Sequence, residues 1–431
     1  NVNFTETNLD NNPGTVTENN AYFTVYSAED NLKTFIPQPN PFNEINKWNN
    51  RFAASEIKIN GENVEQWSNF NIADVYDVDG GNGGINAIMT HNDKLYYWQD
   101  KAFGFMSINP VVTVTDTGTN AEIQLGTGRK LQTHHYISNN SGTKHQGSVL
   151  NTISGLYWID TNNKKIFKFA DSNGTSSLSD VKGMYAYMSR NFNNILIDKP
   201  TYLSAGNNSG ISSGYDIKRN RIYYTIFNGT SPSFTICYNE LTDTFISFHS
   251  FKPNMYISDN KNVLSFDPAT IKDIYVHNEG EYGNYYGIKY KSTLKYIAKD
   301  KINTTYMFGN MQFNTQSVNF NASKIQVNQN QDTWKRIRIT NDYQNTDFQD
   351  LIYNDNLKRV ERTWKLDIPR NRVIYTNNDS PNIYTELSPV RKQFGERIRD
   401  KYIQVELEYD NNDNNLLKTN SITVTGNESP R

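Results

Sequence analysis

The sequence predicts an all-β protein, with β-propeller-like repeated hairpins followed by an antiparallel β-sandwich-like domain. Aromatic residues make up 13% of the chain, mostly Tyr and Phe, which favour the half-buried surface of a sheet. Short apolar runs separated by Gly, Asn, Asp and Pro recur along the chain, as is typical of strands joined by turns. Some of these runs also form a repeated hairpin pattern, which favours an architecture of stacked sheets.

The repeated pattern is a strand that ends in Asp or Asn, a polar turn and a second apolar strand. In the two clearest copies, the spacing from Asp160 to Ile166 equals the spacing from Asn239 to Phe245. A single hairpin cannot bury its faces, whereas hairpins stacked around an axis can, so the pattern favours a propeller over a non-repeating sandwich. The five copies are Leu156–Phe169, Ile236–Phe248, Leu264–Val276, Leu95–Phe105 and Ser213–Thr225.

Asn-Gly dipeptides mark four candidate hairpin tips, because Asn and Gly accept the positive φ angles of a type I′ turn. They are Asn60-Gly61, Asn82-Gly83, Asn173-Gly174 and Asn228-Gly229.

Patterning divides the chain into three regions. Residues 1–56 are expected to form an extended linker that a partner orders, because the first twenty residues are polar with few apolar anchors. Residues 57–310 hold the hairpin repeats and are expected to be propeller-like. Residues 311–431 are expected to be sandwich-like, because Arg336–Ile339 and Ile403–Tyr409 alternate with a period of two.

Charge and cysteine content exclude several classes of protein. The formal net charge of −2 gives no bulk electrostatic footprint for DNA, RNA or an anionic membrane. A single cysteine excludes an internal disulfide framework and a cysteine-based zinc site, and Cys237 is expected to be a buried apolar spacer in a strand. No apolar run reaches the roughly 20 residues of a membrane helix.

The acidic, glycine-rich segment Asp74–Gly84 is the strongest candidate for a metal loop. Its carboxylates suit calcium, but the spacing fails the helix-flanked calcium-loop pattern, and no Lys-Ser or Lys-Thr follows to make a phosphate loop. A turn-rich surface loop is therefore the favoured interpretation.

The sequence contains no recognisable catalytic or cofactor motif. The six histidines (His91, His134, His135, His145, His249 and His277) lack metal-ligand spacing, and no nucleophile elbow is present. We therefore predict no catalytic residue, no cofactor, no metal and no enzymatic activity. A carboxylate pair among 45 acidic residues would leave no local signature, so a polysaccharide-degrading propeller enzyme stays open as an alternative. A carbohydrate- or receptor-binding β module is the other alternative.

Basic residues gather at Lys358–Arg372 and at Arg391–Lys401. Such clusters fit an inter-subunit or nucleic-acid-facing surface. Interleaved acids such as Glu361 and Asp400 favour the solvated face of sandwich strands instead.

Several stretches together resemble the muzzle proteins of crAss-like short-tailed bacteriophages, over most of the chain from Ile57 to Tyr409. They are Gly84–Ile88 before Leu95–Trp98, Ser213–Asp216 before Ile222–Thr225, Phe245–Pro253, Trp364–Arg370 and Arg397–Tyr402. These elements are architectural, so no functional residue is carried over.

The resemblance implies a structural virion protein at the distal end of the tail, around the DNA exit channel. It implies a homo-oligomeric ring that contacts other tail proteins and the upstream part of its own polypeptide, with DNA passing through without specific recognition. It also implies assembly in the bacterial host cytoplasm. The chain is expected to be the later part of a longer polypeptide, in which Asn1 and Arg431 are either processing sites or the limits of a fragment.

Overall fold

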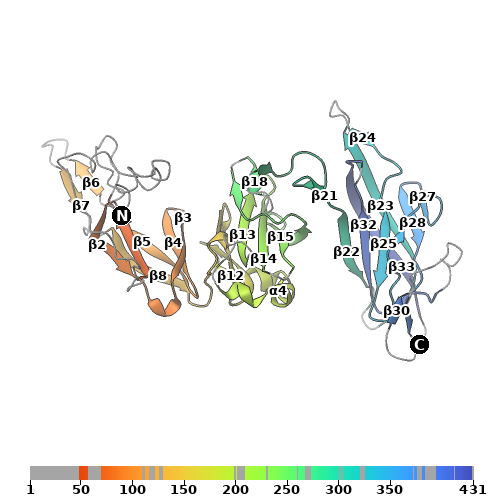
Figure 1. Cartoon of the computed structure of the whole chain (residues 1–431), viewed down its shortest axis with the longest axis horizontal. Coiled ribbons are helices and arrows are strands. Elements are labelled where there is room, and N and C mark those ends of the chain that lie inside the picture. Colours follow the sequence, from red (N-terminus) through yellow and green to blue (C-terminus); the bar gives the residue numbers. More distant parts are fainter. Residues whose placement is uncertain are drawn as a thin grey trace, which may run out of the picture. The chain divides into compact units, whose positions relative to one another are not determined.

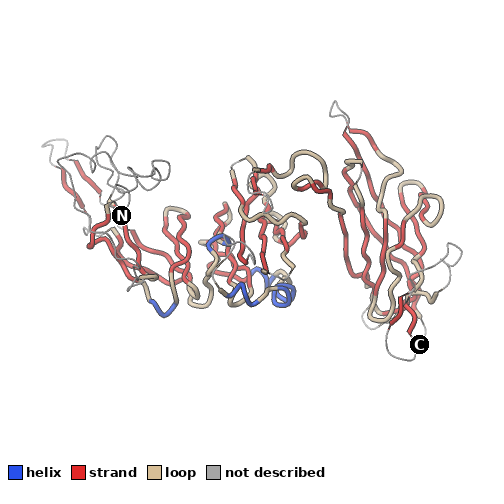
Figure 2. Tube along the Cα trace, in the orientation of Figure 1, coloured by secondary structure: helices blue, strands red, loops and turns tan. Residues whose placement is uncertain are grey.

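The computed structural model describes the chain from residue 48 to residue 429 with gaps. The described residues are 48–56, 69–108, 112–115, 122–125, 130–198, 200, 209–229, 232–259, 261–266, 273–299, 301, 304–320, 326–371, 373–375, 381–383, 395–411 and 413–429. Strands dominate these residues and helices are few and short (Figure 2), so the predicted all-β class is confirmed. No helix in the described part of the chain is long and apolar enough to cross a membrane.

The chain divides into two compact units, Asn1–His277 and Asn278–Arg431. The expected boundary near residue 310 lies inside strand β23 (Tyr306–Phe320). Strand β22 (Ser292–Ala298) belongs with the second unit because all seven of its residues pair with β32 (Ile403–Tyr409). Most of residues 1–56 lie outside the described residues, so the expected linker is not described there.

The first unit contains a series of antiparallel sheets, and four of them carry the hairpin repeats (Figure 1). The first sheet joins β3 (Ile85–His91), β4 (Lys94–Gln99), β5 (Phe103–Ile108) and β8 (Leu131–Ser138). The second sheet joins β9 (Leu150–Thr152), β10 (Gly155–Asp160), β11 (Lys165–Ala170) and β12 (Gly174–Ser177). The third sheet joins β13 (Ser209–Asp216), β14 (Arg221–Asn228), β15 (Phe234–Asn239) and β16 (Thr244–His249). The fourth sheet joins β17 (Tyr256–Ser258), β18 (Val263–Phe266) and β19 (Ile274–Val276).

Two smaller pairs complete the first unit. They are β1 (Arg51–Ser55) with β2 (Phe70–Asp77), and β6 (Val112–Thr115) with β7 (Glu122–Leu125). Phe52 of β1 packs edge-on against Tyr97 of β4, with ring centroids 5.2 Å apart. The β1–β2 pair therefore covers the face of the first sheet that the second sheet leaves open.

Successive sheets of the first unit stack face to face through aromatic side chains. Trp98 of the first sheet meets Trp158 of the second, with ring centroids 5.7 Å apart. Tyr157, on the opposite side of the same strand, lies 6.1 Å from Tyr238 of the third sheet. Strand β10 is consequently buried along its whole length, which explains why its sequence is almost continuously apolar. The Thr225 hydroxyl, 2.7 Å from the Tyr256 hydroxyl, joins the third sheet to the fourth.

The two hairpins with equal spacing pair in the same way next to their turns, and the third sheet then shifts register at a bulge between Cys237 and Tyr238. Asp160 pairs with Lys165 in the second sheet, and Asn239 pairs with Thr244 in the third. Each hairpin lies within a four-stranded antiparallel sheet. This topology alone does not establish a propeller, which also requires the sheets to close into a ring.

Two of the candidate hairpin tips lie in hairpins as predicted and one is wrong. Gly174 (φ 69°) begins β12 directly after the turn from β11, and Gly229 (φ 66°) follows β14 before the chain returns in β15. In both dipeptides only the Gly has a positive φ, so the expected type I′ geometry is not found. Gly83 (φ 87°) instead caps a 3₁₀ turn, η5 (Gly80–Asn82), between two strands of different sheets. A Gly with a positive φ occurs at helix C-caps as well as in hairpin turns, so an Asn-Gly dipeptide alone does not distinguish the two structures. Asn60-Gly61 lies outside the described residues.

Short helices cover one side of the second and third sheets. They are α3 (Leu178–Val181), α4 (Tyr185–Asn191), η7 (Asn194–Ile197) and, earlier in the chain, η6 (Gln146–Ser148). Ser177 begins α3 by accepting a hydrogen bond from the Asp180 backbone N–H. Met188 and Leu196 are fully buried in the core shared by the second and third sheets.

The second unit consists of two main antiparallel sheets. The β32 sheet has the order β22, β32, β25 (Arg336–Thr340), β26 (Gln349–Asp350). The β23 sheet has the order β24 (Gln326–Asn328), β23, β28 (Thr363–Asp367), β27 (Leu357–Val360), and β23 also pairs with β31 (Arg399–Asp400) and β33 (Leu416–Glu428). Two small pairs, β20 (Asn284–Tyr285) with β21 (Ile288–Lys289) and β29 (Val373–Tyr375) with β30 (Pro381–Ile383), lie outside these sheets.

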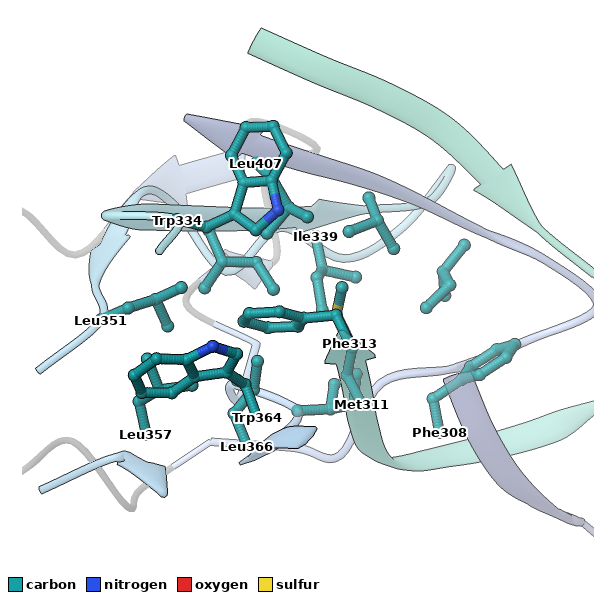
Figure 3. Packing of buried hydrophobic residues seen from close by; sticks show 14 of the residues in the cluster. Phe308, Met311, Phe313, Trp334, Ile339, Leu351, Leu357, Trp364, Leu366 and Leu407 are labelled. Carbon is teal, nitrogen blue, oxygen red and sulfur yellow. The ribbon is translucent and has the colours of Figure 1, made fainter. Parts of the chain in front are cut away.

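One hydrophobic core holds the two main sheets of the second unit together. Figure 3 shows Phe313 and Trp364 of the β23 sheet in the same cluster as Ile339 and Leu407 of the β32 sheet. Strand β32 alternates strictly between buried and half-buried residues, as its sequence predicts. Alternation in Arg336–Ile339 likewise buries both isoleucines completely.

Candidate functional site

A hollow of about 820 Å³ opens where the first strands of the four repeat sheets approach one another. Its walls come from the β3–β4 hairpin, from β9 and the turn after it, from the end of β13, and from the end of β17. The lining residues are Thr90, His91, Asn92, Asp93, Lys94, Leu95, Ile108, Leu150, Asn151, Thr152, Ile153, Tyr215, Ile217, Ser258 and Asp259.

Hydrogen bonds between sheets fix the walls of the hollow. His91 Nδ1 lies 2.8 Å from Asn151 Oδ1, and Asn151 Nδ2 donates to the Thr90 carbonyl at 2.9 Å. Asn92 Nδ2 donates to Asp171 Oδ2 at 2.8 Å. This bond is the main reason why the pKa of Asp171 lies below its ordinary value. The β3–β4 hairpin tip is therefore bonded to the second sheet at two places, Asn151 of β9 and Asp171 after β11.

A second polar group lies beside the hollow, around Glu240. Its Oε1 accepts hydrogen bonds from the hydroxyls of Thr152, at 2.7 Å, and Ser154. Ser154 also lies 2.9 Å from the Tyr157 hydroxyl, whose pKa burial raises. Glu240 follows the third sheet and its partners belong to the second, so the carboxylate ties two sheets together. Most polar groups around the hollow thus bond to one another, which suits an architectural role.

The acidic segment 74–84 does not gather its carboxylates into a metal site. Asp74 pairs with Lys130 at 2.9 Å, and Asp77 pairs with Arg51 at 2.6 Å. Asp79 Oδ1 accepts a hydrogen bond from the Gly81 backbone at 2.8 Å and thereby caps the 3₁₀ turn. Across the described part of the chain, no group of three or more His, Cys, Asp or Glu residues could hold a metal ion.

The structure separates four of the six histidines and brings two together. His134 and His135 point to opposite faces of β8, as a strand requires: His134 lies 2.9 Å from the Tyr76 hydroxyl and His135 stacks on Phe105. His145 is buried and bonds the Leu196 carbonyl. His249 and His277 both contact Phe251 at the interface of the third and fourth sheets, one stacked on its ring and the other edge-on to it. Sequence reasoning missed this pair because no short-range spacing connects the two residues.

The first basic segment lies on the β27–β28 hairpin, where Lys358, Arg362 and Lys365 are exposed. Arg359 stacks over Trp364 at 5.4 Å. In the second segment, residues 391–394 lie outside the described residues.

A charged ladder on the β32 sheet was not singled out from the sequence. Arg336 pairs with Glu408 at 3.1 Å, and the neighbouring Arg338 pairs with Glu406. The sequence does show that both strands alternate charged and apolar residues. Only the pairing of β25 with β32 makes the charges complementary.

Comparison with known proteins adds three findings. Residues 3–269 match the family model described as Crassvirus muzzle protein. The chain is 26% identical over 366 residues to the muzzle protein of Bacteroides phage crAss001, an alignment that covers 84% of this chain and 25% of that protein. The chain thus spans about a quarter of the length of this relative. A chain of the Nidogen/Laminin complex aligns with 52% of this chain and 76% of its own length, at 12% identity and a TM-score of 0.23, a value from which no likeness of fold follows.

Proposed function

The chain belongs to the Crassvirus muzzle protein family, and from this premise we propose that it is a structural component of the bacteriophage tail at the distal muzzle, around the DNA exit channel. The observation that carries the proposal is the family match over residues 3–269, which covers the whole run of the first three repeat sheets. A phage structural role and a place in the virion follow from the family.

The rigid packing of the first unit supports the proposed structural role. Five successive layers, from the β1–β2 pair to the fourth sheet, contact one another through large buried aromatic side chains, with Tyr223 and Tyr256 joining the last two. Aromatic residues bury much area with few rotatable bonds, so such a stack is rigid at a low cost in side-chain entropy. A structural protein that has no disulfide needs stability of this kind.

We propose that the stacked sheets are part of a β-propeller. In each repeat sheet the first strand lies at an edge, and the hollow shows that the first strands β3, β9, β13 and β17 approach one another. Radial stacking with first strands innermost is the arrangement of propeller blades. The proposal keeps the expected order of a linker (1–56), a propeller-like region and a sandwich-like domain, but it moves the boundary between the last two from residue 310 to Asn278, where the second compact unit begins.

The proposed partners are further copies of the chain in a ring, the upstream part of the same polypeptide and other tail proteins. DNA would pass through without specific recognition, which is compatible with a net charge of −2. Assembly would take place in the bacterial host cytoplasm.

Cryo-electron microscopy of purified virions tests the location. We expect density for this chain in a ring at the end of the tail distal to the capsid. Finding the protein in the capsid, or its absence from purified particles, would contradict the proposal.

Light scattering tests the oligomeric state. It is applied to the purified chain alone and to the chain co-expressed with any upstream segment of its gene. A cooperatively folded monomer under both conditions would contradict the ring.

A carbohydrate- or receptor-binding module is the second candidate function, because the hollow combines exposed hydroxyl, amide and carboxylate groups with apolar side chains. Saturable binding of host capsular polysaccharide would support it. Release of reducing sugar above a heat-inactivated control would instead support the polysaccharide-degrading alternative, whereas we propose a non-enzymatic protein.

A further inference from the structure

We propose that the interface between the third and fourth sheets is a pH-sensitive latch, in which neutral His249 and His277 hold β17–β19 against the third sheet and their protonation releases it. This inference goes beyond the proposed structural role and does not depend on it.

The two histidines belong to one aromatic cluster. His249 stacks on Phe251 with centroids 4.8 Å apart, and His277 meets the same ring edge-on at 4.8 Å. Tyr223 contacts both imidazoles, at 5.3 Å and 6.3 Å. His249 ends β16 of the third sheet, and His277 follows β19 of the fourth, so the cluster joins the two sheets.

Both imidazoles also hold a serine hydroxyl. His249 Nε2 lies 3.0 Å from Ser247 Oγ, and His277 Nε2 lies 2.6 Å from Ser265 Oγ. A neutral imidazole can accept the proton of that hydroxyl, whereas a protonated imidazole can only donate. Protonation therefore reverses this bond, with the serine oxygen as the acceptor, and places a charge in an interface where burial disfavours the charged form.

The charged surroundings favour the neutral form. The ionisable groups around the pair are Asp216 at the end of β13, Arg221 and Tyr223 on β14, Cys237 beside Tyr223 on β15, and Tyr256 on the fourth sheet. Asp216 is the one acid in this set, and it already pairs with Arg219 at 3.2 Å. With both histidines charged, the interface would hold two new cations, of which His249 lies within the influence of Arg221.

Burial is the main cause of the low pKa of each histidine, about 4 for His249 and about 4 for His277. The ordinary value is 6.5, so the histidines bind protons more readily when the sheet is released than when it is docked. Docking is therefore strongest above pH 6.5, weakens as the pH falls toward 4, and changes little below that. The direction of the effect follows from the desolvation of two imidazoles in one interface.

The fourth sheet is the layer that can detach. It has three strands of at most four residues, whereas the other repeat sheets have four strands. Its outward face leaves Ile257 40%, Ile274 57% and Val276 38% exposed. A layer that is covered on one face opens at a lower cost than a layer buried on both faces, such as β10.

Hydrogen exchange of the full chain, read by mass spectrometry at pH 7.5 and pH 5.5, tests the latch. After correction for the intrinsic pH dependence of exchange, the opening constant of β17–β19 should rise about a hundredfold, roughly tenfold for each histidine. Peptides from β10 and β14 should change much less. No selective change in β17–β19, or an equal change throughout the first unit, would overturn the proposal.

The variant that tests the cause is H249Q/H277Q. Glutamine keeps a polar group near each serine hydroxyl but does not titrate, so the rise on acidification should shrink to within about threefold. The matched control H135Q, on β8 of the first sheet, should keep the full wild-type response. A full response in the double variant would overturn the proposal. If the double variant does not fold, the single variants H249Q and H277Q should each retain about a tenfold rise, and a full hundredfold rise in both would overturn it equally.

Discussion

Asp160 and Asn239 occupy the same position in two hairpins of different sheets and close their turns with the same pair of hydrogen bonds. Asp160 Oδ1 accepts from the backbone N–H groups two and three residues further along, at 2.8 and 3.1 Å. Asn239 Oδ1 does the same at 2.9 and 3.0 Å. Four residues after each, the chain takes a positive φ, 54° at Lys164 and 53° at Asp243. The repeat in the sequence is therefore a repeat in turn chemistry.

Removing the Asp160 side chain should destabilise the first unit. Asp160 is 1% exposed, and its Oδ2 also accepts from the Gly142 backbone at 3.3 Å and from Asn163 Nδ2 at 2.7 Å. D160A leaves the buried Gly142 N–H without an acceptor and removes the partly buried bonds to Asn162 and Asn163, so we expect a loss of about 2–3 kcal/mol in the free energy of unfolding by urea.

N239A is the matched control for this prediction. The turn that Asn239 closes is more exposed, and water can replace the lost bonds, so the expected loss is about 1 kcal/mol. D160N should fall between the two variants, because it keeps Oδ1 but points an amide at the donors that Oδ2 now satisfies. An equal loss in D160A and N239A would contradict the account based on burial.

The hairpins could be predicted from sequence because their information is local. The strand ending in Asp160 and the return strand are adjacent, so turn chemistry and alternation are enough to specify them. The order of the sheets could not be predicted, because it depends on which face of β10 meets which neighbour, and Tyr157 and Trp158 are equally apolar candidates for either face.

Long-range pairing also explains what was missed at the candidate sites. The unit boundary differs from the expected one because β22 pairs with β32, more than a hundred residues further along the chain. His249 and His277 meet only because the fourth sheet folds back on the third. No local spacing encodes either contact.

Trp158 should be among the most costly positions of the first unit to truncate. It is fully buried, and its ring lies 4.6 Å from Phe103 and 5.7 Å from Phe167. W158A should lower the free energy of unfolding by about 3–5 kcal/mol, because a large cavity opens between two sheets. Ile153, in the turn before the same strand, is 79% exposed, and I153A should change stability by less than about 0.5 kcal/mol in the same urea titration. Comparable losses in the two variants would contradict the assigned core.

The pair Arg338–Glu406 should make a measurable contribution to the second unit. The Glu406 side chain is 14% exposed, and Arg338 also stacks on Phe348 at 4.5 Å, so the pair is partly shielded from water. A double-mutant cycle with R338M and E406Q should give a coupling energy of about 0.5–1.5 kcal/mol that decreases at high salt. Lys301–Glu428 is the control: with side chains 66% and 58% exposed it should show no measurable coupling, and a larger value there than at Arg338 would contradict the role of burial.

Cys237 should be chemically inert in the native protein. Its side chain is 0% exposed in β15, which confirms the expected burial, and burial raises the pKa of the thiol to about 12. At pH 8 only about one molecule in ten thousand would carry the thiolate that a disulfide reagent attacks, even if the reagent could reach it. We expect no reaction with Ellman's reagent over the time in which the urea-unfolded chain gives one thiol per molecule. C237A should remain folded, because the thiol takes part in no chemistry that the fold needs. Rapid labelling of the native chain at pH 8 would show that β15 is more open to water than its neighbours Tyr223 and Ser247 on the adjacent strands indicate.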